Sequence, residues 1–466
     1  MEARIKNEPK YMNFTGNLTR ILILCICVFS YHSVTIFAAS AAVSSSTMLD
    51  TFEEKKDLVT NDPEQNNFPK KSAKTDSKDP PEFKLIVDSH LLAIEQKEGE
   101  EGPYSLELSE MLYNLGKILQ SNRRPNEAIA VYRKALYIKR INDGLYGLSQ
   151  EAILRGIINS QTSQGNITET TITYGQLLQV YLETYGQNST NLIPLMSEVG
   201  QWNLDAYSQT GSRNDGSHLE IAFQLYSDAI RILTEHQDES NAKLLSLLTS
   251  LATTCYHLSA HQQLYPDFGE LGASVPFGYR SMAPKNTVLG RGAYFNHGLL
   301  AQNQILKILN ENYNSTKKEK ALGQTNLGDW YLLFGKYQLA IDAYKESYNI
   351  VTGNKEAKED LDRLYSRPAM LPRRDSFFGS QGSRIIEPRQ KSTPPSTGNY
   401  VNLLVDVTAA GSATNFNIQK IYPAETHEYG ERAIETIRSK KFRPHLKDGV
   451  PELATDFPIR VILPNE

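Results

Sequence analysis

A 42-residue period in the middle of the chain constrains the fold more than any other feature. The dipeptides Leu115-Gly116, Ile157-Ile158 and Val199-Gly200 follow one another at this spacing. Leu251-Ala252 comes 52 residues after Val199, and Leu327-Gly328 opens a last, shorter unit. Periods of roughly 20–50 residues are typical of arrays in which each repeat is one supersecondary unit that packs on its neighbours. The sequence therefore predicts an array of helix pairs and a mainly α chain.

Small and aromatic residues recur at a second place in each repeat. They are Ala128, Tyr132 and Ala135; Thr170, Tyr174 and Leu177; Ala222, Tyr226 and Ala229; and Ala340 and Tyr344. The third set comes ten residues later than its predecessors, which predicts an insertion over 210–218. Small residues let two helix axes approach closely. We therefore expect close-packed helix pairs, with the tyrosines filling the groove to the next pair.

This pattern resembles the tetratricopeptide repeat, and its longer units resemble the extended form of kinesin light chains. The resemblance implies a right-handed α-superhelix over 104–364, with about five helix pairs. A Gly- and Pro-rich loop is expected to interrupt it at about 262–292. By the same resemblance, first-helix positions off the packing face line a groove for protein or peptide partners. These positions are Tyr113, Lys117, Arg155, Asn159, Gln201 and Asp329. Because they carry no single sign of charge, they indicate no ligand class, and a solvated face that binds nothing in particular is the alternative.

The C-terminal segment 399–466 changes to strand patterns. Two of its stretches alternate apolar and polar residues, as half-buried strands do. The apolar residues are Val401, Leu403, Val405 and Val407 in the first stretch and Phe457, Ile459, Val461 and Leu463 in the second. A further strand through Phe416 and a helix over 429–441 are predicted between them. The order strand, strand, helix, strand predicts a small α+β domain.

Motif residues in this domain resemble the C-terminal domain of TonB, the energy transducer of the Gram-negative envelope. They are Gly411, Phe442, Arg443, Pro444 and Gly449, followed by Phe457-Pro458-Ile459. The resemblance implies a structural role for the first five. It also implies that the last strand, through Phe457, Ile459, Val461 and Leu463, offers its edge to an extended peptide of an outer-membrane transporter. Pro458 has no N–H and favours an edge strand. The alternative is a small α/β cap whose edge is protected.

The N-terminal segment 1–41 has the features of a secretory signal peptide. Its apolar run from Ile21 to Phe37 follows Arg20 and leads into the small residues Ala39-Ser40-Ala41. An uncleaved membrane anchor, with membrane association through 21–41, is the competing interpretation. TonB transducers carry a Ser-x-x-x-His pair in their anchor, whereas Ser30 and His32 are only two residues apart here. This departure weakens the case for direct energy transduction.

Two linkers complete the predicted organisation. The segment 42–103 is polar and acidic, and we expect it to be mostly disordered. The segment 365–398 is rich in basic residues, Pro and Ser, and we expect it to be an extended tether for the C-terminal domain. Its excess positive charge suits contact with anionic lipid or cell-wall polymer. A soluble spacer is the alternative for this basic linker.

No pattern of catalytic or metal-ligating residues stands out. His257 and His261 are one helical turn apart with Cys255 nearby, a spacing that can hold zinc. No carboxylate lies between them as in metalloproteases, so ordinary repeat packing accounts for them better. Gly-rich phosphate loops, Gly-x-Ser-x-Gly elbows and paired CxxC motifs are absent from the sequence. We therefore predict no enzyme activity, no cofactor and no metal.

The sequence as a whole predicts a non-enzymatic scaffold in the periplasm of a Gram-negative bacterium. A net charge of −4 argues against nucleic acid as a partner. The repeats would bind a protein, and the TonB-like module would link the chain to outer-membrane transport. The rival hypothesis is a TonB-type energy transducer for transmembrane transport, anchored in the inner membrane and facing the periplasm.

Overall fold

A computed structural model gives the structure of the 466-residue chain. It describes residues 80–210, 215–236, 241–265, 292–371, 377–378, 384–386, 399–423 and 427–463. The leader 1–41, most of the polar segment and most of the expected loop at 262–292 lie outside these ranges, so the predictions for them stay predictions. Residues 1–84 and 85–466 form two separate units, and the fold below is that of the second unit.

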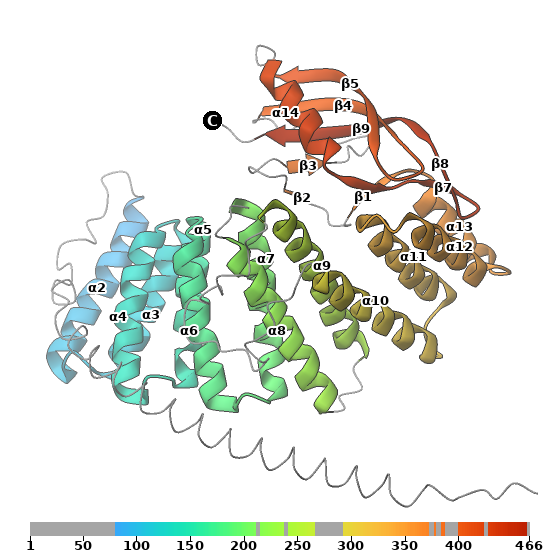
Figure 1. Cartoon of the computed structure of the whole chain (residues 1–466). Coiled ribbons are helices and arrows are strands. Elements are labelled where there is room, and N and C mark those ends of the chain that lie inside the picture. The colour runs from blue at the N-terminus through green and yellow to red at the C-terminus, as the bar shows by residue number, and fades with distance from the viewer. Residues whose placement is uncertain are drawn as a thin grey trace, which may run out of the picture. The chain divides into compact units, whose positions relative to one another are not determined.

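Helix pairs follow one another along the described part of the repeat region (Figure 1). They are α3 (Leu106–Ser121) with α4 (Pro125–Asp143), α5 (Glu151–Ser163) with α6 (Ile167–Tyr185), α7 (Ile193–Thr210) with α8 (Gly216–Glu235), α9 (Asn241–Leu264) with α10 (Ala293–Glu311), and α11 (Lys317–Leu333) with α12 (Tyr337–Val351). Short 3-10 turns precede α5 (Leu148–Gln150) and α7 (Thr190–Leu192). The second helix of each pair packs on the first helix of the next. The predicted series of helix pairs is therefore confirmed.

Glycines on first helices make room for tyrosines on second helices. A Cβ atom at Gly116 of α3 would lie 2.5 Å from the Tyr132 ring, and one at Gly156 of α5 would lie 2.7 Å from the same ring. Tyr132 of α4 thus fills the space between its own pair and the next one, as predicted. Tyr344 stands in the same relation to Gly328 within the last pair. Because the rings are buried, these contacts set how closely the helices approach.

Additional helices flank the repeats at both ends. α13 (Lys355–Tyr365) packs on α11 and α12. α2 (Pro81–Glu101) occupies the C-terminal third of the segment predicted as mostly disordered, so the expectation of disorder is wrong for this third. Val87 and Ile94 of α2 are buried and lie two helical turns apart, on one face. The acidic composition of the segment predicted disorder, so the helical spacing of these two apolar residues was not used.

The C-terminal segment contains a sheet in the order β2-β3-β9-β4-β5. Its long strands are β4 (Asn399–Val407), β5 (Ala413–Tyr422) and β9 (Ala454–Leu463), and α14 (His427–Arg438) packs on them (Figure 1). The predicted order strand, strand, helix, strand is therefore present. Short strands that were not predicted lie between α14 and β9: β6 (Lys441–Arg443), β7 (His445–Lys447) and β8 (Val450–Glu452). The alternating apolar residues of β4 and β9 form the domain core, as expected.

The linker contributes strands to the C-terminal domain instead of being an extended tether. β1 (Ala369–Leu371) pairs with β6, while β2 (Phe377–Phe378) and β3 (Arg384–Ile386) join the edge of the sheet at β9. Leu371 and Leu446 are buried in one cluster with side chains of α11, α12 and α13. The expectation of a flexibly tethered domain is wrong, because these two residues and the ion pair between Arg443 and Asp329 join the domain to the last helix pair. Composition alone did not reveal which linker residues would be buried.

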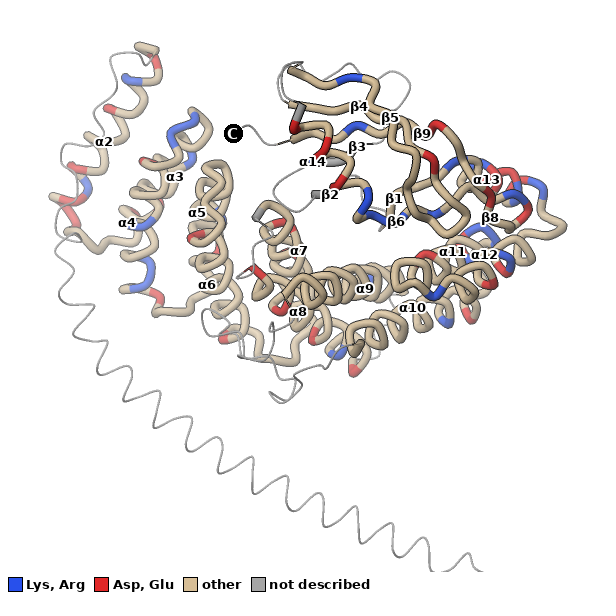
Figure 2. Tube along the Cα trace, turned by 45° about the horizontal axis from the view of Figure 1, so that its top comes forward, with Lys and Arg blue, Asp and Glu red and all other residues tan. Residues whose placement is uncertain are grey.

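Charges of both signs occur on α3, α4, α5, α8, α10, α11 and α12, whereas α6 and α7 carry only acidic residues and α9 carries only Lys243 among its charged residues (Figure 2). Among the described residues, we find no helix whose length and apolar character would let it cross a membrane.

Candidate functional site

The six predicted groove positions differ in how accessible they are. Lys117 on α3 and Asn159 on α5 are exposed, whereas Tyr113 and Gln201 are half-buried. The Lys117 Nζ atom lies 5.6 Å from the centre of the Tyr113 ring, within range of a cation–π contact. The Tyr113 ring in turn lies 5.8 Å from the Tyr132 ring. Lys117 and Asn159 therefore offer the most accessible polar groups of this set.

Arg155 of α5 is held by carboxylates instead of being free to meet a ligand. Its Nε donates to Glu151 at 2.8 Å, and its Nη1 donates to both oxygens of Glu198 at 2.9 and 3.0 Å. Tyr181 and Tyr174 donate to the same two carboxylates. Burial lowers the pKa of Arg155, but these carboxylates raise it more, so the net pKa lies above its ordinary value. Arg155 thus ties α5 to α7 and fixes the spacing of two neighbouring repeats.

Asp329 of α11 does not line an open groove, so this predicted site residue is wrong. Its side chain is buried, and its carboxylate accepts two hydrogen bonds from the guanidinium of Arg443 on β6. The Arg443 Nε to Asp329 Oδ1 distance is 2.7 Å. A fork-shaped guanidinium matches a carboxylate in this way with two parallel bonds. The position that repeat geometry assigns to a partner is occupied by the C-terminal domain of the same chain.

Aromatic side chains complete the surroundings of this ion pair. The Tyr344 hydroxyl donates to Asp329 Oδ1 at 2.9 Å, and Arg443 lies 5.7 Å from the centre of the Tyr365 ring. Burial lowers the pKa of Arg443, yet the charge and hydrogen bonds of Asp329 raise it above its ordinary value. Burial, followed by the charge of Asp329, raises the pKa of Tyr344. Arg443 therefore stays charged and Tyr344 neutral at physiological pH.

The other motif residues shape the C-terminal domain around this contact. Gly411 has φ +71° and its carbonyl accepts from the Phe442 backbone N–H at 2.9 Å. A Cβ at Gly411 would lie 2.2 Å from the Phe442 carbonyl oxygen, so no other residue fits there. Phe442 and Pro444 are buried on either side of Arg443. Gly449, at φ +78°, makes the turn between β7 and β8. These residues thus form turns and buried contacts in the C-terminal domain.

The predicted acceptor edge on β9 is only partly open. β9 pairs with β4 on one side and with β3 on the other, where Ile386, Ile385 and Arg384 oppose 460–462. The side chains of Phe457, Ile459, Val461 and Leu463 are buried in the core of the sheet. β9 is therefore an inner strand of the described sheet over 460–462, and the prediction of an unoccupied edge is wrong there. The sequence of the linker did not predict that β3 would pair with β9.

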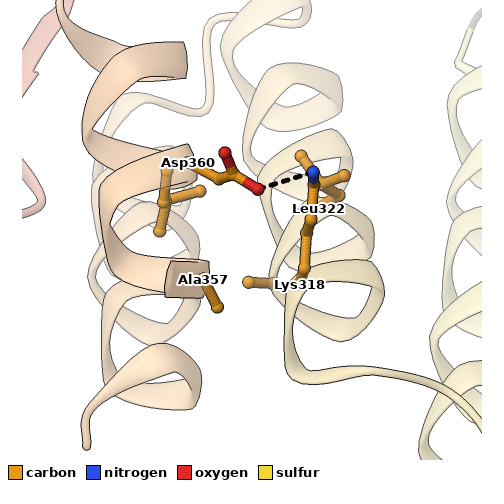
Figure 3. A pocket seen from close by; sticks show the side chains of 6 residues that line it. Lys318, Leu322, Ala357 and Asp360 are labelled. Atoms are coloured by element: carbon orange, nitrogen blue, oxygen red, sulfur yellow. Dashed lines mark ion pairs between the residues drawn. The ribbon is translucent and has the colours of Figure 1, made fainter. Parts of the chain in front are cut away.

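Two small hollows lie in the described surface of the repeats. One, of about 20 Å³, lies between α11 and α13, where Lys318 Nζ and Asp360 form an ion pair at 2.6 Å (Figure 3). This volume is close to that of a single water. A second, of about 210 Å³, is lined mostly by polar residues of α4, α5, α6 and the turn between α5 and α6, including Arg133 and Glu169, together with Ile129 and Ala130. No group of three or more His, Cys, Asp or Glu side chains in the described ranges could hold a metal ion.

The two histidines considered for zinc lie in a packed aromatic region. His261 is buried, and its Nδ1 lies 3.2 Å from the Tyr207 hydroxyl, while the His257 ring packs against Tyr207 and Tyr256. Burial raises the pKa of the Cys255 thiol, which keeps it protonated. These contacts support ordinary repeat packing at this position.

One helix pair of the chain is similar in sequence to a known protein family. Residues 109–142, which form most of α3 and all but the end of α4, match the family model of the tetratricopeptide repeat. The chain contains a tetratricopeptide repeat. Nothing in these comparisons shows a TonB C-terminal domain. No curated protein matches the sequence at a significant level.

Solved structures that match the chain include two with repeats of this type, both at low sequence identity. BtubC from P. vanneervenii is 14% identical with a TM-score of 0.30, and the match covers 59% of this chain and 92% of that one. A putative kinesin light chain from Podosopora anserina with nearly identical TPR-like repeats is 14% identical with a TM-score of 0.33, over 55% of this chain and 99% of that one.

Proposed function

We propose that the chain is a non-catalytic scaffold of the bacterial cell envelope that binds a protein or peptide partner through its repeats. In the proposal it is exported to the periplasm and carries a TonB-like docking module, through which it meets extended peptides of outer-membrane transporters. The observation that carries the binding role is the series of helix pairs, one of which matches the tetratricopeptide repeat. Such arrays present an extended surface, and that surface is their usual means of binding.

The contacts between the C-terminal module and the last helix pair support the proposal. Arg443 joins it to the last helix pair through a buried ion pair, and Leu446 packs in the same cluster as Tyr344 and Tyr365. A partner that binds near the last helix pair therefore lies close to the module. This arrangement favours a single composite scaffold over two independently moving binding domains.

Fractionation tests the proposed location. We expect the protein in the periplasmic fraction with a mature N-terminus near Ala42, measured by mass spectrometry of the purified chain. Retention in the inner membrane with residues 21–37 intact would contradict export as a free protein. That outcome would favour the anchored energy transducer instead.

Affinity capture from envelope extracts tests the binding surface. The bait is the wild-type chain, compared with Lys117→Glu and with Asn159→Arg, which change the two exposed groove residues. We expect a partner band that both variants lose. Lys307→Glu, on the exposed face of α10, is the matched control and should retain the band. A band lost equally in all three variants, or in none, would contradict binding at this surface.

A further inference from the structure

The outer edge of β9 is covered by a short strand from the linker of the same chain. β3 pairs antiparallel with β9, with Arg384 opposite Ile462 and Ile386 opposite Arg460. On its inner side, β9 pairs with β4 from Ala454 to Leu463. The linker thus adds a strand to the side of β9 that faces away from β4.

The part of β9 that β3 covers is the part best suited to accept a strand. Towards its start, Asp456 has φ +54° and Pro458 has no N–H to donate. The remaining residues, 459–463, form a regular strand whose alternate side chains are buried in the core. A regular unpaired edge is a ready template for another chain. β3 therefore occupies most of the usable edge.

The opposite edge of the described sheet is less suited to this role. β5 carries two register shifts in its pairing with β4, and Asn415 within it has φ +49°. Bulges and irregular backbone of this kind hinder the addition of a further strand. The usable acceptor edge of the sheet is thus on β9.

β3 itself is only a small obstacle to a competing strand. It is three residues long, and its only other strand partner in the described sheet is the two-residue β2. Pairing over three residues provides few backbone hydrogen bonds, each of modest net stability in water. A longer extended peptide can form more such bonds along 459–463 than β3 does.

We propose that β3 is an internal strap that occupies the strand-acceptor edge of β9, and that an extended peptide partner binds by displacing it. The proposal rests on the docking role proposed above for the C-terminal module and adds its regulation. While β3 is paired with β9, the edge cannot bind a peptide. The apparent affinity for the peptide is therefore the intrinsic affinity multiplied by the fraction of molecules in which β3 is detached. It also protects a flat edge from pairing with other copies of the chain.

Full-length variants with a synthetic peptide test the strap. The probe is a fluorescently labelled peptide with the sequence of residues 381–387, so that it carries the strand of the strap itself. Ile385→Pro removes a backbone N–H from β3 and should free the edge. Binding by fluorescence anisotropy should then be at least about ten-fold tighter than to the wild type, because the competing strand is gone. Lys391→Pro, in the same linker but outside the described strands, is the matched control and should bind as the wild type does.

A cross-strand disulfide provides the opposite test. Arg384 and Ile462 are opposite each other in the register, so Arg384→Cys/Ile462→Cys should form a disulfide that locks β3 on β9. We expect the oxidised form not to bind the probe and the reduced form to bind it as the wild type does. Equal binding by both forms would overturn the strap.

Hydrogen exchange of β9 amides separates failure of the strap from failure of the docking role. If exchange at 460–462 is unchanged in Ile385→Pro and the probe binds it no better than the wild type, the strap is wrong while docking can stand. If exchange at these amides rises and the probe still does not bind, the edge accepts no strand and the proposed docking role fails with it. Faster exchange together with tighter binding supports both.

Discussion

Arg443 of β6 and Asp329 of α11 form a buried ion pair across 114 residues of chain. The carboxylate also accepts from Tyr344, and the guanidinium packs against Tyr365, so both charges lie away from water. The last helix pair and the C-terminal domain are joined by this contact. Because a buried charge without its partner is costly, the pair makes each domain dependent on the other.

Asp329→Asn should destabilise the protein strongly. It leaves the buried guanidinium of Arg443 without its counter-charge, and breaking a buried pair in this way costs about 3–5 kcal/mol. The free energy of unfolding from urea titration measures this loss. Asp342→Asn, at an exposed position of α12, is the control and should change it by less than about 0.5 kcal/mol. Similar losses in both variants would contradict the importance of the pair.

Replacing both charges together should cost less than the two single replacements suggest. Asp329→Leu/Arg443→Met removes both buried charges, so no uncompensated charge remains. We expect the loss in unfolding free energy to be smaller than the sum for Asp329→Leu and Arg443→Met alone. Strictly additive losses would show that the two side chains do not depend on each other.

Gly116→Ala should destabilise the repeats. The added Cβ would meet the buried ring of Tyr132, which cannot move aside because it also contacts Gly156. Overpacking of this kind costs about 1–3 kcal/mol. Gly99→Ala in α2 is the control, since nothing lies within 4 Å of its added Cβ, and it should be neutral or stabilise by up to about 1 kcal/mol. Thermal unfolding of the two variants would settle this, and a neutral Gly116→Ala would contradict the close helix contact.

Glu220 of α8 should make stability depend on pH. Burial raises the pKa of this carboxyl group from 4.5 to about 7. Its contribution to stability is therefore fully present below about pH 4.5 and is lost as the pH rises through 7. Relative to Glu220→Gln, the wild type should lose unfolding free energy between pH 5 and pH 8. Glu356→Gln, at an exposed position of α13, should show the same pH dependence as the wild type. Parallel curves for the wild type and Glu220→Gln would contradict the raised pKa.

Elements with a strong local pattern were predicted well. The spacing of Leu115-Gly116 and its equivalents located the helix pairs, because each helix buries one face and the pattern repeats with the fold. The alternation in β4 and β9 located these strands for the same reason. α2 was missed, because its three buried residues, Phe83, Val87 and Ile94, lie within an acidic segment whose composition suggested disorder.

The candidate site was predicted less well than the fold. Lys117 and Asn159 are exposed as expected, whereas Arg155 is bound by two carboxylates and Asp329 is buried. All four occupy comparable first-helix positions, and sequence gives no means of telling them apart. Their difference depends on charged partners in other helices or in the C-terminal domain.

The sequence by itself determined the helix pairs, the order of strands and helix at the C-terminus, and the glycines and tyrosines that space the helices. These follow from local periodicity and from side-chain size. Only the tertiary structure decided that Asp329 meets Arg443 and that β3 lies on the edge of β9. An ion pair needs two positions brought together by the whole fold, and strand pairing uses backbone hydrogen bonds that nearly any residue can form.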